Sequence, residues 1–168
     1  MNVESKEDKK RRIDEWWANI LLRHLKKQQG CDYAIGKQHT PDGWADVDVF
    51  ARSKTDKYPP LYIQLCSDIN PKDPGFEKIL KKSKMFKNFG QTIEAVKGKV
   101  EKYKKQDKDF SQITLVIQSH YLIDHDAIYR VPKLRDECNQ YKFKAIYLLS
   151  PKGQFADSTG TERVFQLL

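Results

Sequence analysis

Two short runs of alternating residues place acidic and amide side chains where they could bind a metal ion. The first run extends over residues 45–51 and carries Asp46 and Asp48. The second extends over residues 61–66 and carries Gln64. Carboxylate and amide oxygens are hard ligands that suit Mg²⁺ or Mn²⁺. If the two runs lie side by side, they hold one or two aspartates beside Gln64 on one surface.

The spacing of these runs predicts that they pair as a hairpin of two strands. Residues 52–60 between them are polar and end in Pro-Pro, which is typical of a loop. In a strand, side chains two positions apart share a face. One face is expected to carry Asp46, Asp48 and Phe50 from the first strand and Tyr62, Gln64 and Cys66 from the second, with Val47, Val49, Ala51, Leu61, Ile63 and Leu65 behind them.

This pattern resembles the PD-(D/E)XK nuclease superfamily, and within it the Mrr-like branch. There, Asp on one strand and Glu-x-Lys or Gln-x-Lys on the next form a metal-dependent phosphodiesterase site. The run Asp48-Val49-Phe50-Ala51 matches the first motif, and Gln64-Leu65-Cys66 matches the second at Gln64 only. The resemblance implies an α/β, restriction-endonuclease-like fold with a mixed central sheet flanked by helices. It also implies that Asp48 and Gln64 hold Mg²⁺ or Mn²⁺ for phosphodiester hydrolysis.

The main departure from this pattern is Cys66, which stands where the superfamily has lysine. A thiol supplies neither a cation at neutral pH nor a hard oxygen ligand. Losing one preorganised electrostatic group costs roughly 100-fold in rate or more. A lysine from the next segment could replace it, with Lys72, Lys78 and Lys82 as candidates and Lys82 as the catalytic choice. Alternatively, the fold has lost catalysis and kept a binding role, and the sequence leaves both alternatives open.

The resemblance also implies that an acidic residue on the preceding helix reaches the metal. An apolar stripe of helical spacing starts at Ile13, with Asp14 at its edge and Glu15 on the opposite side. Asp14 is therefore the better placed candidate ligand. The alternative is a solvated acid in the first turn of the helix, where the helix dipole favours negative charge.

The distribution of charge predicts a polyanionic partner. Residues 71–109 contain twelve lysines and six acids, whereas residues 31–70 contain six acids and four bases. An acidic site beside a basic surface suits a metal centre next to a nucleic-acid track. We expect DNA in preference to RNA, with contacts from Lys78, Lys81, Lys82 and Lys84. The alternative is a solvated lysine face on a helix.

The order of the expected elements places these residues in one domain. Residues 1–12 are charged and almost without apolar groups, which predicts a disordered basic N-terminus. Residues 13–168 are expected to form a single domain. Its elements are a helix from Ile13, strands at 31–37, 45–51 and 61–66, helices at 76–86 and 93–103, a buried central strand at 113–117, a short helix opened by Pro132, and strands at 143–149 and 163–168.

Other features narrow the protein class. The three cysteines are far apart, which disfavours a disulfide framework or a closed zinc site. The sequence lacks an 18-residue apolar run and a secretory signal, so we expect no membrane association and a cytoplasmic location. The sequence does not determine the oligomeric state, and a homodimer is one alternative because many superfamily members act as dimers.

In the simplest alternative, the protein is an interaction module. Asp46 and Asp48 then form the solvent face of an edge strand, and Cys66 is an ordinary buried thiol.

Overall fold

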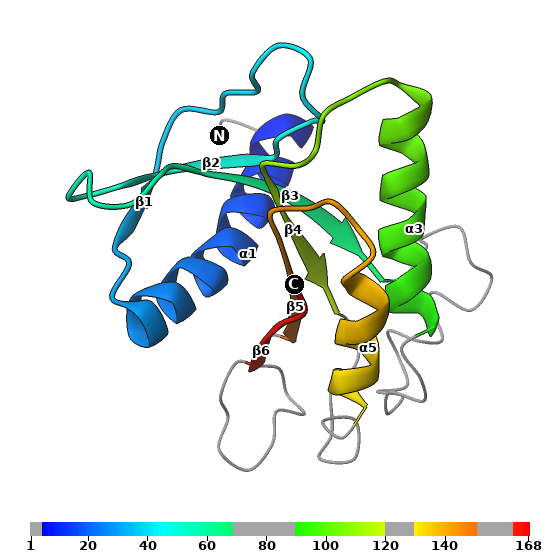
Figure 1. Ribbon diagram of the computed structural model, residues 1–168. Helices are drawn as coiled ribbons and strands as arrows, with labels where there is room; N and C mark the ends of the chain where they lie inside the picture. Colours follow the sequence, from blue (N-terminus) through cyan, green and yellow to red (C-terminus); the bar gives the residue numbers. More distant parts are fainter. Residues whose placement is uncertain (1–4, 69–89, 120–129, 151–162) are drawn as a thin grey trace.

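The computed structural model describes residues 5–68, 90–119, 130–150 and 163–168, and it shows a mixed α/β fold built on one six-stranded sheet (Figure 1). The described helices are α1 (Lys6–Gln29), α3 (Gly90–Lys105) and α5 (Val131–Cys138). The strands are β1 (Tyr33–Ile35), β2 (Val49–Ser53), β3 (Leu61–Ser67), β4 (Ile113–Gln118), β5 (Ala145–Ser150) and β6 (Arg163–Gln166). They lie in the sheet in the order in which they follow along the chain.

The sheet changes from antiparallel to parallel at β3. Strands β1, β2 and β3 form an antiparallel meander, β3, β4 and β5 run parallel, and β6 closes the edge antiparallel to β5. Strand β4 is buried on both faces, as expected for its continuous β-branched run. The predicted hairpin of two strands around the 52–60 loop is present, with Phe50 paired to Tyr62.

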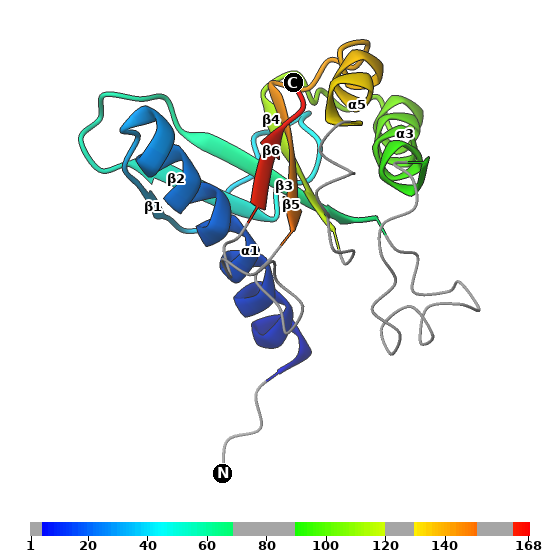
Figure 2. The same cartoon turned by 90° about the horizontal axis from the view of Figure 1, so that it is seen from below.

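Helices cover both faces of the sheet, and each face has its own core (Figures 1 and 2). Helix α1 packs through Trp17, Leu21 and Leu25 against one face, where it meets Ile63 and Leu65 of β3. Helices α3 and α5 cover the other face, and the core there is a separate cluster. It includes Cys66, Val96, Val100, Tyr103, Ile113, Leu115, Ile117, Leu134 and Cys138.

Helix α1 begins well before the expected position, which corrects the prediction of disorder for residues 6–12, whereas residues 1–4 of that segment lie outside the described residues. It starts at Lys6, where the hydroxyl of Ser5 accepts the backbone N–H of Asp8 at 3.0 Å. Glu7 and Asp8 in the first turn add a favourable interaction with the helix dipole. A capped and charge-complemented first turn therefore extends the helix into a segment with no apolar side chains to bury. The helix ends at Gly30, whose φ of 69° is left-handed.

The buried face of α1 also differs from the predicted stripe. Asp14 lies on it, whereas Ile13 and Trp16 are 46% and 48% exposed. The stripe predicted from helical spacing included Ile13 and Trp16 as well as Trp17. Trp17 is buried, and the ring of Trp16 packs edge-on against it at 5.1 Å.

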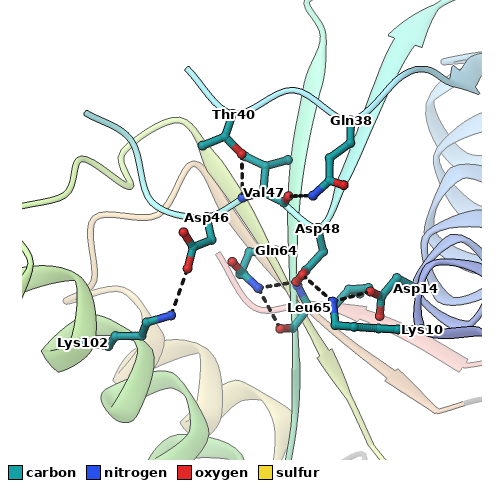
Figure 3. Close-up of polar contacts among 10 residues, drawn as sticks. All are labelled: Lys10, Asp14, Gln38, Thr40, Asp46, Val47, Asp48, Gln64, Leu65 and Lys102. Atoms are coloured by element: carbon teal, nitrogen blue, oxygen red, sulfur yellow. Dashed lines mark hydrogen bonds and ion pairs between the residues drawn. The ribbon is translucent and has the colours of Figure 1, made fainter. Parts of the chain in front are cut away.

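The aspartate strand is shorter than residues 45–51, because β2 starts only at Val49. Val47 packs in the core beneath α3, whereas Val49 packs in the core beneath α1, so the expected common face of these two side chains is wrong. The backbone of Val47 is held by side chains instead of by a neighbouring strand. Its N–H donates to Thr40 Oγ1 at 3.2 Å, and its carbonyl accepts from Gln38 Nε2 at 2.9 Å (Figure 3).

The other elements follow the sequence pattern closely. The structure confirms the helix over 93–103 within α3, the central strand β4, the helix opened by Pro132 and the edge strand β6. Strand β1 covers only Tyr33–Ile35 of the predicted 31–37, and β5 lies at Ala145–Ser150 instead of the predicted 143–149. The helix expected at 76–86 lies outside the described residues.

Candidate functional site

Asp48 lies at the point where β2 separates from β3, and its carboxylate is shared by three donors (Figure 3). Oδ2 accepts the backbone N–H of Leu65 at 2.9 Å and a side-chain N–H of Gln64. Oδ1 accepts from the ammonium of Lys10 at 3.2 Å. The predicted proximity of Asp48 and Gln64 is therefore present, and it arises at the end of a strand pair.

Lys10 joins Asp48 to a second carboxylate, that of Asp14. Lys10 Nζ lies 2.8 Å from Asp14 Oδ2, so acids from α1 and from the start of β2 converge on one ammonium group. Burial raises the pKa of Asp14, the hydrogen bond from Lys10 works against that shift, and the nearby Asp48 carboxylate adds to it. The hydrogen bond with Asp14 raises the pKa of Lys10. Lys10 is therefore positively charged at neutral pH.

The structure selects Asp14 over Glu15, as helical geometry predicted. Asp14 is 9% exposed and faces Asp48, whereas Glu15 pairs with Arg11 at 2.8 Å. The alternative of a solvated acid in the first turn is wrong, because α1 starts at Lys6 and Asp14 lies two turns further on.

Gln64 turns its amide nitrogen toward Asp48 and leaves its carbonyl oxygen without a hydrogen bond. Nε2 donates to Asp48 and, at 3.1 Å, to the carbonyl of Leu65. The oxygen Oε1 is buried and has no partner among the described residues. Rotating the amide by half a turn would exchange the two atoms. It would set Oε1 against Asp48 Oδ2 and the Leu65 carbonyl, an arrangement that a bound cation would stabilise.

Cys66, at the position where the superfamily has lysine, faces the core and is electrostatically close to Asp48. Its side chain is 9% exposed and lies in the core beneath α3. Burial raises the pKa of the Cys66 thiol to about 12, so the group is neutral at physiological pH. The nearby positive charge of Lys99 on α3 lowers that pKa and only partly offsets burial.

Asp46 and Asp48 point to different helices, which corrects the expectation that they share a face. Asp46 pairs with Lys102 of α3 at 2.9 Å, and its side chain is 68% exposed (Figure 3). The hydrogen bond from Lys102 lowers the pKa of Asp46. The candidate site therefore consists of Asp14, Asp48 and Gln64, with Lys10 between the two acids.

The donor set of this site fits a divalent cation of the Mg²⁺ type. Two carboxylates and one unpaired amide oxygen are hard ligands. Among the described residues no group of three or more His, Cys, Asp or Glu side chains is arranged to hold a metal. A cation here would therefore need the Gln64 carbonyl and water in addition to Asp14 and Asp48, and it would compete with Lys10 for both carboxylates.

Lys10 is the site residue that the sequence analysis missed. It lies in the segment expected to be disordered, although its spacing of four residues from Asp14 is the usual spacing of a helical ion pair. The predicted catalytic Lys82, its alternatives Lys72 and Lys78, and the predicted nucleic-acid contacts Lys81 and Lys84 lie outside the described residues.

Comparison with known proteins identifies no relative. No protein-family model, curated protein or solved structure matches the chain. Among the described helices, none has the length and apolar character needed to cross a bilayer. The candidate function therefore rests on the geometry of the site and on the resemblance of its motifs.

Proposed function

We propose that the protein is a nuclease-like, nucleic-acid-binding protein whose site at Asp14, Asp48 and Gln64 supports divalent-metal-dependent phosphodiester hydrolysis. The observation that carries this proposal is the convergence of Asp14 and Asp48 on a single cation, Lys10 Nζ, at 2.8 and 3.2 Å. Two acids from separate elements that share one positive charge make a site that a divalent cation can also occupy.

The topology supports a restriction-endonuclease-like fold as part of this proposal. A helix precedes three antiparallel strands, and a crossover containing α3 then leads to a parallel strand. This is the element order expected from the resemblance. It brings the end of α1 that carries Lys10 and Asp14 to the start of β2, where Asp48 lies (Figure 3).

Asp14, Asp48 and the Gln64 carbonyl would hold Mg²⁺ or Mn²⁺, which in such sites lowers the pKa of a bound water and stabilises charge on phosphate. In the hydrolysis, water oxygen bonds to phosphorus, the bond to the leaving oxygen breaks, and that oxygen takes up a proton. Lys10, displaced from the carboxylates, would remain protonated beside the site. Its side chain is 68% exposed and therefore able to reach a substrate phosphate.

A second candidate function is a catalytically inactive nuclease fold that binds nucleic acid or protein. The observation that favours it is the buried, neutral thiol of Cys66 at the position where the superfamily has lysine. In addition, the Asp48 carboxylate accepts hydrogen bonds from three protein donors, which stabilise its charge without a metal.

Further parts of the proposal concern the partner and its setting. We propose DNA in preference to RNA as the partner, with the lysines of 71–109 contributing to binding. A homodimer is one alternative for the oligomeric state. All cysteines are free and buried, which agrees with a reducing compartment such as the cytoplasm.

The test is a cleavage assay on single-stranded and duplex DNA and RNA with Mg²⁺ or Mn²⁺. Wild-type protein should cut, and Asp48→Ala should lose at least 100-fold, the scale of one preorganised charged group. Asp46→Ala is the matched control, because Asp46 is a neighbouring acid that faces α3. Cleavage that survives Asp48→Ala would refute this site. A wild type that binds nucleic acid but never cuts it would leave the inactive module as the function.

A further inference from the structure

A basic groove lies beside β1 and β2, close to the candidate site. It has a volume of about 540 Å³ and is lined by Gly36, Lys37, Gln38, His39, Phe50 and Arg52. That volume is within the range of roughly 300–1,000 Å³ typical of ligand clefts. The segment between β1 and β2 forms one wall and the start of β2 forms the other.

The groove is held in shape by packing around Phe50. The guanidinium of Arg52 lies 5.3 Å from the centre of the Phe50 ring, and the ring of His39 packs edge-on at 6.1 Å. A Cβ on Gly36 would lie 3.2 Å from the Phe50 ring, so only glycine fits there without displacement. The stacked Arg52 is thereby fixed with its planar group available to an anion.

No carboxylate among the described residues neutralises the positive charge of the groove. Within the described part of the chain, no carboxylate forms an ion pair with Lys37 or Arg52. By contrast, Lys10, Arg11, Lys26, Lys54 and Lys102 all pair with acids. Two unpaired cations and a histidine in one concave surface favour an anionic ligand.

The groove leads to the candidate site. A small neighbouring pocket is lined by Asp48, Arg11 and Glu15, together with Gly36, Gln38 and Phe50, which also line the groove. Gln38 additionally anchors the chain next to Asp48 by its hydrogen bond to the Val47 carbonyl. An extended anion that fills the groove would therefore lie next to the small pocket that Asp48 lines.

We propose that this groove binds the phosphodiester backbone of a nucleic-acid strand and directs it to Asp48. Arg52 and Lys37 contact phosphate oxygens, and His39 contributes a ring N–H. This inference rests on the proposed function, because the strand it guides is the substrate of that site. It assigns the recognition of nucleic acid to described residues, independently of the lysines of 71–89.

The test is binding of a fluorescent single-stranded oligonucleotide by anisotropy, in EDTA so that cleavage does not interfere. The double variant Lys37→Glu/Arg52→Glu should weaken binding at least tenfold. It should also flatten the salt dependence by about 1.5 in log–log slope, as expected for two lost phosphate contacts on a single strand. Lys133→Glu/Lys142→Glu is the matched control, since it changes the charge equally at two exposed lysines, one on α5 and one in the segment before β5, neither of which lines the groove. The control should retain affinity within about twofold of wild type, allowing for weak long-range electrostatics.

The outcomes separate this inference from the proposed function. If Lys37→Glu/Arg52→Glu binds the oligonucleotide as tightly as wild type, the groove is not the binding surface, and the catalytic site is unaffected by that result. If cleavage survives Asp48→Ala, the catalytic site is refuted, and binding in the groove is unaffected. A wild type that binds no oligonucleotide refutes both. If Lys37→Glu/Arg52→Glu does not fold, Lys37→Gln/Arg52→Gln applies the same test with neutral side chains. Calorimetry with inorganic phosphate distinguishes a nucleic-acid strand from a small anion as the ligand. Tight binding of phosphate without binding of the oligonucleotide would mean that the groove binds a small anion and not a strand.

Discussion

The carboxylate of Asp48 accepts the backbone N–H of Leu65 at 2.9 Å, just beyond the last residue pair of β2 and β3. The backbone N–H of Asp48 in turn donates to the carbonyl of Ile63 at 2.9 Å. A side chain thus continues the pairing after the backbone of β2 has turned away. Asp48 therefore has a structural role in addition to the proposed metal-binding role, and variants must separate the two.

Replacing Asp48 by Ala and by Asn should make this separation. Asp48→Ala leaves the Leu65 N–H without its acceptor and should lower the free energy of unfolding by about 1–3 kcal/mol. Asp48→Asn keeps an oxygen acceptor and should lose clearly less stability, while losing the charge that would hold a metal. Urea unfolding measures both. Equal losses in the two variants would contradict the role of the carboxylate as an acceptor for Leu65.

Lys10 is expected to be the cation of the site. Lys10→Met should reduce any metal-dependent cleavage by about 100-fold or more, the scale of removing one preorganised electrostatic group. Arg11→Met is the matched control, because it removes a neighbouring charge that pairs with Glu15 and not with Asp14. Single-turnover rates at saturating metal provide the measurement. A loss confined to Lys99→Met would place the catalytic cation on α3 instead.

Cys66→Lys should destabilise the fold and should not restore a superfamily-like site. The side chain would enter the core beneath α3, where Cys66 is 9% exposed. Burying an unpaired ammonium there should lower the free energy of unfolding by about 3 kcal/mol or more. Cys66→Val, which keeps a small apolar side chain, is the control for packing. A folded Cys66→Lys protein that cuts nucleic acid faster than wild type would mean that the core opens at this position.

Asp14 should make the stability depend on pH in a defined direction. Burial raises its pKa above the ordinary value of 3.8, so the folded protein holds this proton more tightly than the unfolded chain does. The resulting stabilisation is fully present below pH 3.8 and is lost as the pH rises through the higher pKa of the folded state. The difference in unfolding free energy between wild type and Asp14→Asn should therefore fall as the pH rises from 3 to 7. In a protein that also carries Lys10→Met, this difference should fall more steeply with pH. The reason is that Lys10 stabilises the charged carboxylate of Asp14 and its removal raises the pKa of Asp14 further. A difference that does not change with pH would contradict the buried position of Asp14.

The lysines of the 71–89 segment should add to nucleic-acid affinity in a salt-dependent way. Replacing Lys81, Lys82 and Lys84 by Glu should weaken binding and reduce the log–log salt slope by about 2–3, since each phosphate contact contributes roughly 0.7–0.9. Gel-shift titrations at two salt concentrations measure both effects. An unchanged affinity would leave the groove at Lys37 and Arg52 as the main contact surface.

Local pattern was sufficient for much of the fold. The alternation of Leu61 to Cys66 predicted which side chains of β3 face each core, and the β-branched run of β4 predicted a strand buried on both faces. Strand and helix periodicity depend on residues close in sequence, so they can be read without knowledge of the fold. The proximity of Asp48 and Gln64 followed from the same reasoning, because a short loop between two strands favours a hairpin.

The details of the site depended on contacts between residues distant in sequence. The backbone of Val47 is held by Gln38 and Thr40, and β2 begins only at Val49. Asp46 and Asp48 therefore turn toward different helices. Lys10 becomes a site residue only because α1 packs across the sheet and brings its first turns to Asp48, 38 residues away. The local composition around Lys10 is highly charged, and it therefore predicted an unstructured segment. A contact with a residue so distant in sequence leaves no pattern in the local composition. Sequence pattern therefore determined the strands and the acids that they carry, whereas helix packing decided which acids meet and which cation lies between them.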